Sequence, residues 1–278
     1  MKEIVSYQPF NNVRNFYIQQ INGERDKLIY ESDKLRYTID ISAIPFVPKS
    51  GLLLCPFIED LFSRHRIETV LDIGTGPSCL LARHAAACGA KLVDATEIDP
   101  AILNYVHCHS GGYPSTINII SSDNYVNIPN RKYDLIVSNP AQMPRLHHLH
   151  QYHDASGYSG RENLEAIISD ATKHLTPNGR LLLLAFGFLG VKSRTNNHTI
   201  SLVDLIAQRG MAVEKCERIE VNIRPGGGIH RSLSAIQELY PIYQFPIANE
   251  VICNEIYILQ CSPQYTSMPF SSKHRTSP

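Results

Sequence analysis

Strand-like apolar runs alternate with helix-like segments along most of the chain, and this alternation limits the fold more than any other feature. The predicted strands lie at residues 68–73, 91–97, 116–121, 133–138, 180–186, 213–220 and 254–261. The predicted helices lie at residues 77–88, 100–110, 161–175 and 199–209. Such alternation predicts an α/β fold with a mostly parallel seven-stranded sheet covered on both faces. No clear helix separates the last two strands, so we expect a final antiparallel strand.

The pattern divides the chain into three parts. We expect an N-terminal cap at 1–45, a main domain at 46–261, and a mobile tail at 262–278, which is rich in Ser, Pro, Lys and Thr. An insertion at about 222–250 interrupts the main domain between its last two strands.

The cap is predicted to combine a helix with a β-hairpin. Residues 1–26 form the expected helical lead-in, and Lys27–Tyr30 and Leu35–Ile39 alternate as the two strands of a hairpin. After the proline-rich entry to the main domain, Ser50 is expected to cap a helix that runs to about Arg64.

Composition and charge exclude several kinds of protein. Lys+Arg and Asp+Glu both number 26, so no global basic field would attract nucleic acid. Seven scattered cysteines without a CxxC pair argue against a disulfide framework or a zinc knuckle and favour reduced thiols in a cytoplasmic protein. The N-terminus has no apolar signal core, and the longest apolar run, Leu181–Val191, is too short to cross a bilayer.

A glycine turn at the end of the first strand predicts a ligand site. Asp72-Ile73-Gly74-Thr75-Gly76 follows an apolar run and opens a helix, where glycines let the backbone approach a ligand closely. Glu97 ends the next strand, about twenty residues on, where an acid typically accepts hydrogen bonds from ribose hydroxyls. A nicotinamide site would want a third glycine at Cys79, and no Gly-Lys-Ser/Thr of a phosphate-binding loop follows. A tight turn without a ligand is the plain alternative.

An Asn-Pro pair follows a later strand and predicts a place for a reacting nitrogen. Asn139 and Pro140 come directly after Tyr133–Ser138. The Asn139 side-chain oxygen and the Pro140 carbonyl can each accept one N–H of an NH2 group, which orients the nitrogen lone pair. The same oxygens would stabilise positive charge that develops on the nitrogen. A simple strand-ending turn is the alternative.

Together these residues resemble the cofactor site of class I S-adenosylmethionine-dependent methyltransferases, which have a Rossmann-like, doubly wound fold. The resemblance covers roughly residues 45–261. It implies that S-adenosylmethionine is the cofactor and assigns its binding to residues after successive strands: Asp72, Gly74, Gly76, Glu97, Asp123 and Asn139. Ser78 replaces a frequent third glycine of this family, which should narrow the loop without abolishing binding.

The second motif is similar to the Asn-Pro-Pro-Tyr motif of methyltransferases that act on planar nitrogens, including release-factor glutamine and adenine-N6 enzymes. The resemblance implies that Asn139 and Pro140 are the catalytic residues. Ala141 replaces the second proline and Gln142 replaces the aromatic residue, so the ring that would stack on a nucleobase is missing. The segment Asp154–Glu162 also resembles the glutamine group, but the N-terminal segment is too short for that group's separate helical domain, which grips a protein substrate.

Three side chains are predicted to face the substrate: Gln142, Arg161 and Arg224. Arg224 begins the glycine-rich segment Arg224–Arg231, which we interpret as a lid over the active site, with a flexible surface loop as the alternative. A histidine-rich loop follows the Asn-Pro pair, at His147, His148, His150 and His153. Its spacings are not those of a metal site, so we expect no metal there and favour a substrate-lining or solvated loop.

The sequence as a whole predicts an S-adenosylmethionine-dependent methyltransferase. We expect it to transfer methyl to a nitrogen of a small molecule or peptide, with nucleic acid a less favoured acceptor and no membrane partner. An adenine-N6 RNA or DNA methyltransferase, a methyltransferase-like subunit without catalysis, and, more weakly, an NAD-dependent oxidoreductase stay open. The acceptor atom and the oligomeric state are not defined by the sequence.

Overall fold

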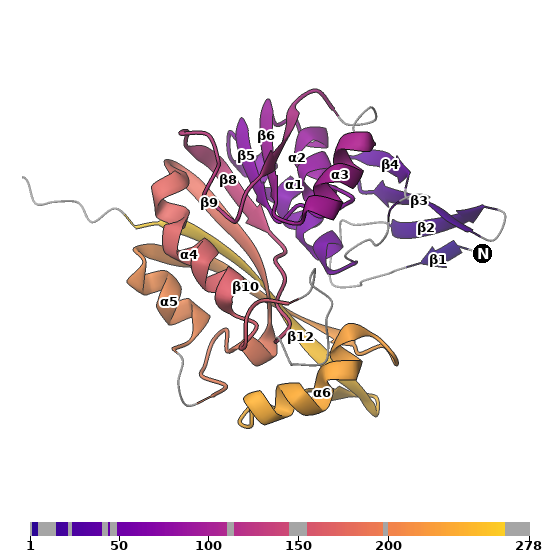
Figure 1. Ribbon diagram of the computed structural model, residues 1–278, viewed down its shortest axis with the longest axis vertical. Helices are drawn as coiled ribbons and strands as arrows, with labels where there is room; N and C mark the ends of the chain where they lie inside the picture. Colours follow the sequence, from indigo (N-terminus) through magenta and orange to yellow (C-terminus); the bar gives the residue numbers. More distant parts are fainter. Residues whose placement is uncertain are drawn as a thin grey trace, which may run out of the picture.

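One large sheet organises the molecule. The computed structural model describes residues 2–4, 15–21, 24–40, 44, 49–109, 114–144, 155–196 and 200–264. The strands of the large sheet are β5 (Thr69–Ile73), β6 (Leu92–Glu97), β7 (Ile117–Ser121), β8 (Tyr133–Ser138), β9 (Leu175–Phe186), β10 (Met211–Asn222), β11 (Ile247–Ala248) and β12 (Val251–Pro263). Their order is β10-β12-β9-β8-β5-β6-β7, with β11 paired to β12 (Figure 1).

The pairing confirms the predicted sheet. β7, β6, β5, β8 and β9 are parallel, whereas β12 is antiparallel to both β9 and β10. The chain order reverses between β5 and β8, because β6 and β7 continue on one side and β9 on the other. In open α/β sheets, ligands bind in the crevice at such a reversal, outside the carboxyl ends of the strands.

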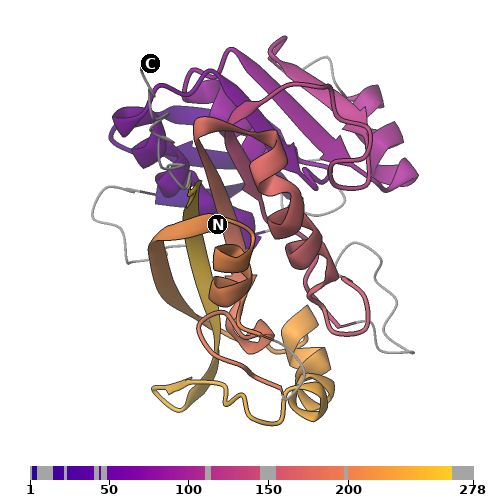
Figure 2. The ribbon, with the colours of Figure 1, turned by 90° about the vertical axis from the view of Figure 1, so that its left-hand side faces the viewer.

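Helices cover both faces of this sheet, and residues of one strand alternate between the two sides. Val70 packs in a core with α1 (Cys55–Arg64) and α2 (Leu80–Ala87), while its neighbour Leu71 packs in a second core with α4 (Glu162–His174) and α5 (Leu202–Gln208). α3 (Pro100–Cys108) adds to the first core. Figure 2 shows α4 and α5 in front of the sheet.

The predicted N-terminal helix is wrong. The described residues there form a four-stranded antiparallel sheet of β1 (Lys2–Ile4), β2 (Asn15–Ile21), β3 (Glu24–Glu31) and β4 (Arg36–Asp40). Asn15–Ile21 contains β-branched and aromatic residues, and pairing with β3 selects the extended form over local helix preference. The predicted hairpin is confirmed as β3 and β4.

The cap is joined to the main domain through side chains of its hairpin. Leu28, Tyr30 and Ile39 are buried in the core that contains α1 and α2. The Tyr30 hydroxyl donates to Glu59 of α1, and the Tyr37 hydroxyl lies 2.9 Å from Nδ1 of His84 in α2. The cap therefore packs on the face of the sheet that carries α1 to α3 (Figure 1).

Two further predictions need correction. Ser50 does not cap an α-helix, because Lys49–Leu54 is a 3-10 helix (η1) and α1 begins at Cys55 with Pro56 in its first turn. The glycine-rich segment is not simply a loop, since Gly228–Leu239 forms helix α6, which lies at the bottom of the molecule in the view of Figure 1. β12 also extends to Pro263, into the predicted tail, and residues 265–278 lie outside the described part. No helix in the described part of the chain could cross a membrane.

Candidate active site

The glycine turn after β5 is built on a buried carboxylate. Asp72 is fully buried, and its Oδ2 accepts hydrogen bonds from the Thr75 hydroxyl at 2.6 Å and the Ala82 N–H at 3.1 Å. Burial raises the pKa of Asp72 to about 7. These bonds tie the turn to the first helical residues of α2, so Asp72 shapes the turn from beneath and does not line the cavity described below.

Gly74 and Gly76 place bare backbone at the surface of this turn. Their φ angles are +72° and +65°, which L-residues rarely adopt, and a Cβ at either position would meet nothing within 4 Å. Both glycines therefore face open space, which leaves room for a ligand to lie directly against the backbone.

Glu97, at the end of β6, is organised by three backbone donors. Its Oε2 accepts from Gly76 N–H at 3.1 Å, and its Oε1 accepts from Ile98 and Asp99 N–H at 2.8 and 2.9 Å. The carboxylate is 7% exposed. These bonds fix the acid beside the glycine turn, and an oxygen that already accepts one bond can still accept a hydroxyl.

The Asn-Pro pair lies directly after β8. The Asn139 amide contacts the Ser50 hydroxyl of η1, with Nδ2 at 3.2 Å and Oδ1 at 3.4 Å from Ser50 Oγ. The Pro140 carbonyl accepts one hydrogen bond, from Gln142 Nε2 at 3.2 Å, which leaves its second lone pair available. Ser50 thus orients the Asn139 amide, a role that the sequence did not indicate.

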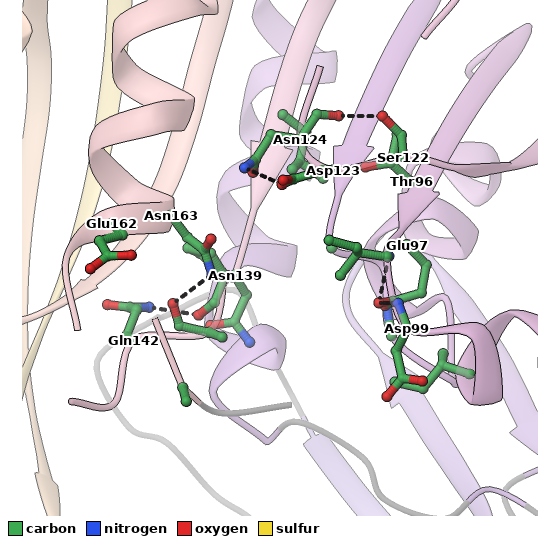
Figure 3. A pocket seen from close by; sticks show the side chains of 18 of the residues that line it. Thr96, Glu97, Asp99, Ser122, Asp123, Asn124, Asn139, Gln142, Glu162 and Asn163 are labelled. Atoms are coloured by element: carbon green, nitrogen blue, oxygen red, sulfur yellow. Dashed lines mark hydrogen bonds between the residues drawn. The ribbon is translucent and has the colours of Figure 1, made fainter. Parts of the chain in front are cut away.

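The strand-end motifs meet in one cavity of about 980 Å³, shown in Figure 3. Its lining brings together most of the residues predicted to bind cofactor or acceptor: Gly74, Gly76, Glu97, Asp123, Asn139, Pro140 and Gln142. Figure 3 shows Glu97 and Asp99 on one side, Asn139 and Gln142 on the other, and Asp123 with Asn124 after β7. The sequence did not single out two other lining residues, Phe186 and Asn163.

The Gln142 side chain is buried although the residue lines the cavity. It is 2% exposed, and its Nε2 donates to the carbonyls of Pro140 and Leu184 while its Oε1 accepts from Phe186 N–H at 2.8 Å. Its amide therefore fastens the Asn-Pro turn to β9. The predicted contact with substrate would have to compete with these three bonds.

The other two predicted substrate residues lie outside this cavity. Arg161 is 1% exposed, and its guanidinium binds Glu165 and the carbonyls of Leu189 and Ile200, so it joins two segments of the chain. Arg224 lines a second, smaller cavity. The histidine-rich loop lies outside the described residues, within which no group of three or more His, Cys, Asp or Glu side chains is placed to hold a metal.

The cavity fits the cofactor that the sequence implies. Bare glycine backbone, a fixed carboxylate at the end of the next strand, and polar side chains after β7 are features that the resemblance assigns to S-adenosylmethionine binding. The volume lies at the upper end of the roughly 300–1,000 Å³ typical of ligand pockets. It leaves room for an acceptor beside the cofactor.

The fold and the cavity define a class I S-adenosylmethionine-dependent methyltransferase. The model of the methyltransferase small domain matches residues 50–213, more than half of the chain, and the chain belongs to that family.

The chain is similar to curated proteins that are named glutamine methyltransferases. Release factor glutamine methyltransferase of Cereibacter sphaeroides is 33% identical over 183 residues, 60% of this chain and 60% of that protein. Ribosomal protein uL3 glutamine methyltransferase of Bradyrhizobium diazoefficiens is 28% identical over 127 residues, 42% of this chain and 40% of that protein. The chain thus spans at most about 60% of the length of either relative. A solved putative methyltransferase from Bacillus halodurans shares the fold, with 13% identity, a TM-score of 0.50, and coverage of 76% of this chain and 99% of that chain.

Proposed function

We propose that this protein transfers a methyl group from S-adenosylmethionine to a nitrogen of a small-molecule or peptide acceptor. The observation that carries the proposal is the shared cavity, which is lined by the glycine turn, Glu97, Asn139 and Pro140. Asn139 and Glu97 lie on opposite sides of it (Figure 3). Strand ends that bind a cofactor and strand ends that bind an acceptor must face the same space for direct transfer.

The cofactor would be held by Gly74, Gly76, Glu97 and Asp123. When bound, S-adenosylmethionine supplies an electrophilic methyl group on a positively charged sulfur. Glu97 accepts hydroxyl donors from a position fixed by three backbone bonds, and the glycines allow close backbone approach. Asp72 keeps the turn in this shape from below.

Asn139 and Pro140 orient the accepting nitrogen. Asn139 Oδ1 and the free lone pair of the Pro140 carbonyl each accept one N–H of an NH2 group, which leaves the nitrogen lone pair directed at the methyl group. The same two oxygens stabilise the positive charge that grows on nitrogen during transfer. Ser50 and Gln142 hold the amide and the carbonyl in place before substrate arrives.

The named relatives support a peptide amide as one acceptor of this kind. Two of them are glutamine methyltransferases by name, and a glutamine side chain presents a planar NH2 group. A nucleobase is less favoured, because the buried Gln142 offers no ring for stacking, an interaction worth about 1–3 kcal/mol per base.

The substitution Asn139→Ala tests the proposal. We expect turnover to fall on the order of a hundredfold, because one oxygen that orients and stabilises the nitrogen is lost. Affinity for S-adenosylmethionine, measured by calorimetry, should stay near the wild-type value. Asn104→Ala, an equivalent change at an exposed position on α3, serves as the control and should leave both quantities unchanged.

Acceptors are found by incubating the protein with labelled S-adenosylmethionine and fractionated cell extract. Label in a nitrogen-bearing small molecule or peptide supports the proposal. The proposal fails if folded protein binds no S-adenosylmethionine, or if Asn139→Ala lowers cofactor affinity and turnover equally.

A further inference from the structure

A second cavity of about 240 Å³ adjoins the cofactor cavity. It lies where the end of β10, the middle of β12 and the start of α6 meet, and Ser50 and Phe186 line both cavities. Ser50 also holds the Asn139 amide. The second cavity, called the second chamber below, is therefore a neighbour of the place where a nitrogen would meet Asn139.

A buried amide lines the chamber with unmet hydrogen-bonding capacity. Asn254 of β12 is 3% exposed, and its Oδ1 has no hydrogen-bond partner in the described part of the protein. Buried polar groups are nearly always paired, because an unpaired one costs about 1–3 kcal/mol. The Asn254 Nδ2 also makes no hydrogen bond to the described residues, so this N–H donor is available to a ligand.

The N-terminus of α6 opens onto the same chamber. Gly227 is the N-cap residue, no described side chain caps this 12-residue helix, and its first turn holds no acidic residue. Gly227 and Gly228 both belong to the lining. The first N–H groups of a helix have no partner within the helix, and together with the helix dipole they attract an anion.

The charged residues of the lining are basic. Arg224 and His230 contribute to it at exposed positions, and none of the described lining residues is acidic. The remaining walls are mainly apolar, formed by Val221, Ile223, Ile229 and Ile256 together with Phe186. The chamber thus combines apolar walls with one polar end at the start of α6.

We propose that this chamber binds the carboxylate of the methyl acceptor. The carboxylate lies at the α6 N-terminus near Asn254, a short apolar stem lies along the isoleucine wall, and the accepting nitrogen reaches Asn139 past Ser50. The acceptor is then a small amine or amide that also carries a carboxylate. This inference rests on the proposed methyl transfer, because it identifies the remainder of the molecule whose nitrogen is methylated.

The test measures binding of hexanoate and, as its neutral match, hexanamide to the full chain by NMR titration. Hexanoate should shift the backbone amide signals of Gly228 and Ile229 and the side-chain amide of Asn254. It should bind about fivefold or more tightly than hexanamide, because only the anion gains from the helix terminus. Equal binding of both probes, or shifts elsewhere only, would overturn the inference.

Two substitutions at one position sharpen the test. Gly227→Asp places a preferred N-cap residue at an extended backbone position (φ −70°, ψ 168°), so the new carboxylate occupies the helix terminus itself. Hexanoate binding should fall by about tenfold or more. A Cβ at this position would lie 3.2 Å from the Arg224 carbonyl oxygen, so the melting temperature of the variant is measured alongside binding. Gly227→Asn, which caps without charge, should weaken binding less, and Arg209→Gln, on an exposed arginine remote from the chamber, should not change it. Unchanged hexanoate affinity in Gly227→Asp would refute the site.

A second variant covers the case in which Gly227→Asp disturbs α6. Asn254→Leu removes the buried amide without changing the helix, and it should also weaken hexanoate binding severalfold. If it does not, Asn254 takes no part in the site and the inference fails.

Failure here is distinguishable from failure of the proposed function. Hexanoate binding requires neither cofactor nor turnover. Label transferred to an uncharged small molecule or to a protein glutamine would refute the carboxylate and leave methyl transfer standing. Absence of S-adenosylmethionine binding would remove the proposed function, whatever hexanoate does.

Discussion

Gln142→Leu is the substitution that best separates a structural from a substrate-binding side chain in this site. β8 ends its pairing with β9 at Ser138 and Leu183, and the next backbone groups of β9 on that side are the Leu184 carbonyl and the Phe186 N–H. The Gln142 amide takes both, at 3.0 and 2.8 Å. It therefore extends the ladder beyond the point where β8 leaves the sheet.

Leucine at this position would leave two backbone groups of β9 unpaired. Each unpaired buried group costs about 1–3 kcal/mol, and burial of the leucine offsets part of that loss. We expect Gln142→Leu to lower the free energy of unfolding by about 2–4 kcal/mol. Turnover should fall as well, because the Pro140 carbonyl also loses its partner at 3.2 Å.

Urea denaturation followed by circular dichroism measures this loss, with an unchanged slope as the sign of an unchanged native fold. Gln142→Glu is the matched control, because glutamate has nearly the same size and shape as glutamine but no N–H donor when ionised. One of its oxygens can accept from Phe186 N–H, but the other faces the carbonyls of Leu184 and Pro140, so it should also be destabilised at pH 8 and recover partly as the carboxyl is protonated. If Gln142→Leu keeps its free energy of unfolding within about 0.5 kcal/mol of the wild-type value and raises KM instead, Gln142 is a substrate contact and not a structural side chain.

Two carboxylates of the cofactor side give further predictions. Because burial raises the pKa of Asp72 to about 7 from 3.8, its contribution to stability is complete below pH 4 and is lost as pH rises to about 7. Thermal melts at pH 5 and pH 8 measure this loss of stability. In Asp72→Asn the melting temperature should fall less between the two pH values than in the wild type. Part of the fall should stay, because the pKa of Glu59 is also about 7. Glu97→Gln turns an NH2 group toward backbone donors, so calorimetry should show S-adenosylmethionine binding weakened about tenfold or more.

The large sheet could be predicted because hydrophobic runs in the sequence mark its buried strands. β8 and the later part of β9 are almost entirely buried, and they contain the hydrophobic runs Leu135–Val137 and Leu181–Phe186. Local patterns were insufficient for β2, whose extended form depends on its partner β3. Helix α6 was missed because the glycines before it signal a loop, although Ile229, Ile236 and Leu239 have helical spacing.

Sequence reasoning identified residues that share a cavity where they follow strand ends, but it did not predict contacts between distant partners. The glycines, Glu97 and Asn139 meet in one cavity because parallel strands end at the same edge. In contrast, Gln142 and Arg161 looked like substrate groups because their partners, the carbonyls of Leu184 and Leu189, lie 42 and 28 residues away. No local pattern of residues indicates such contacts.

The replacement of the aromatic residue by Gln142 changes what selects the acceptor. A ring after the Asn-Pro pair recognises the flat face of a substrate, whereas an amide bonded to β9 fixes the turn and recognises nothing planar. Ser50 fixes the other side of the same turn from 89 residues away. Under the proposed function, the oxygens of Asn139 and Pro140 are then rigid but common to any NH2 group, so selectivity would come from the remainder of the acceptor. The second chamber, which shares Ser50 and Phe186 with the cofactor cavity, is the place where that selection can act.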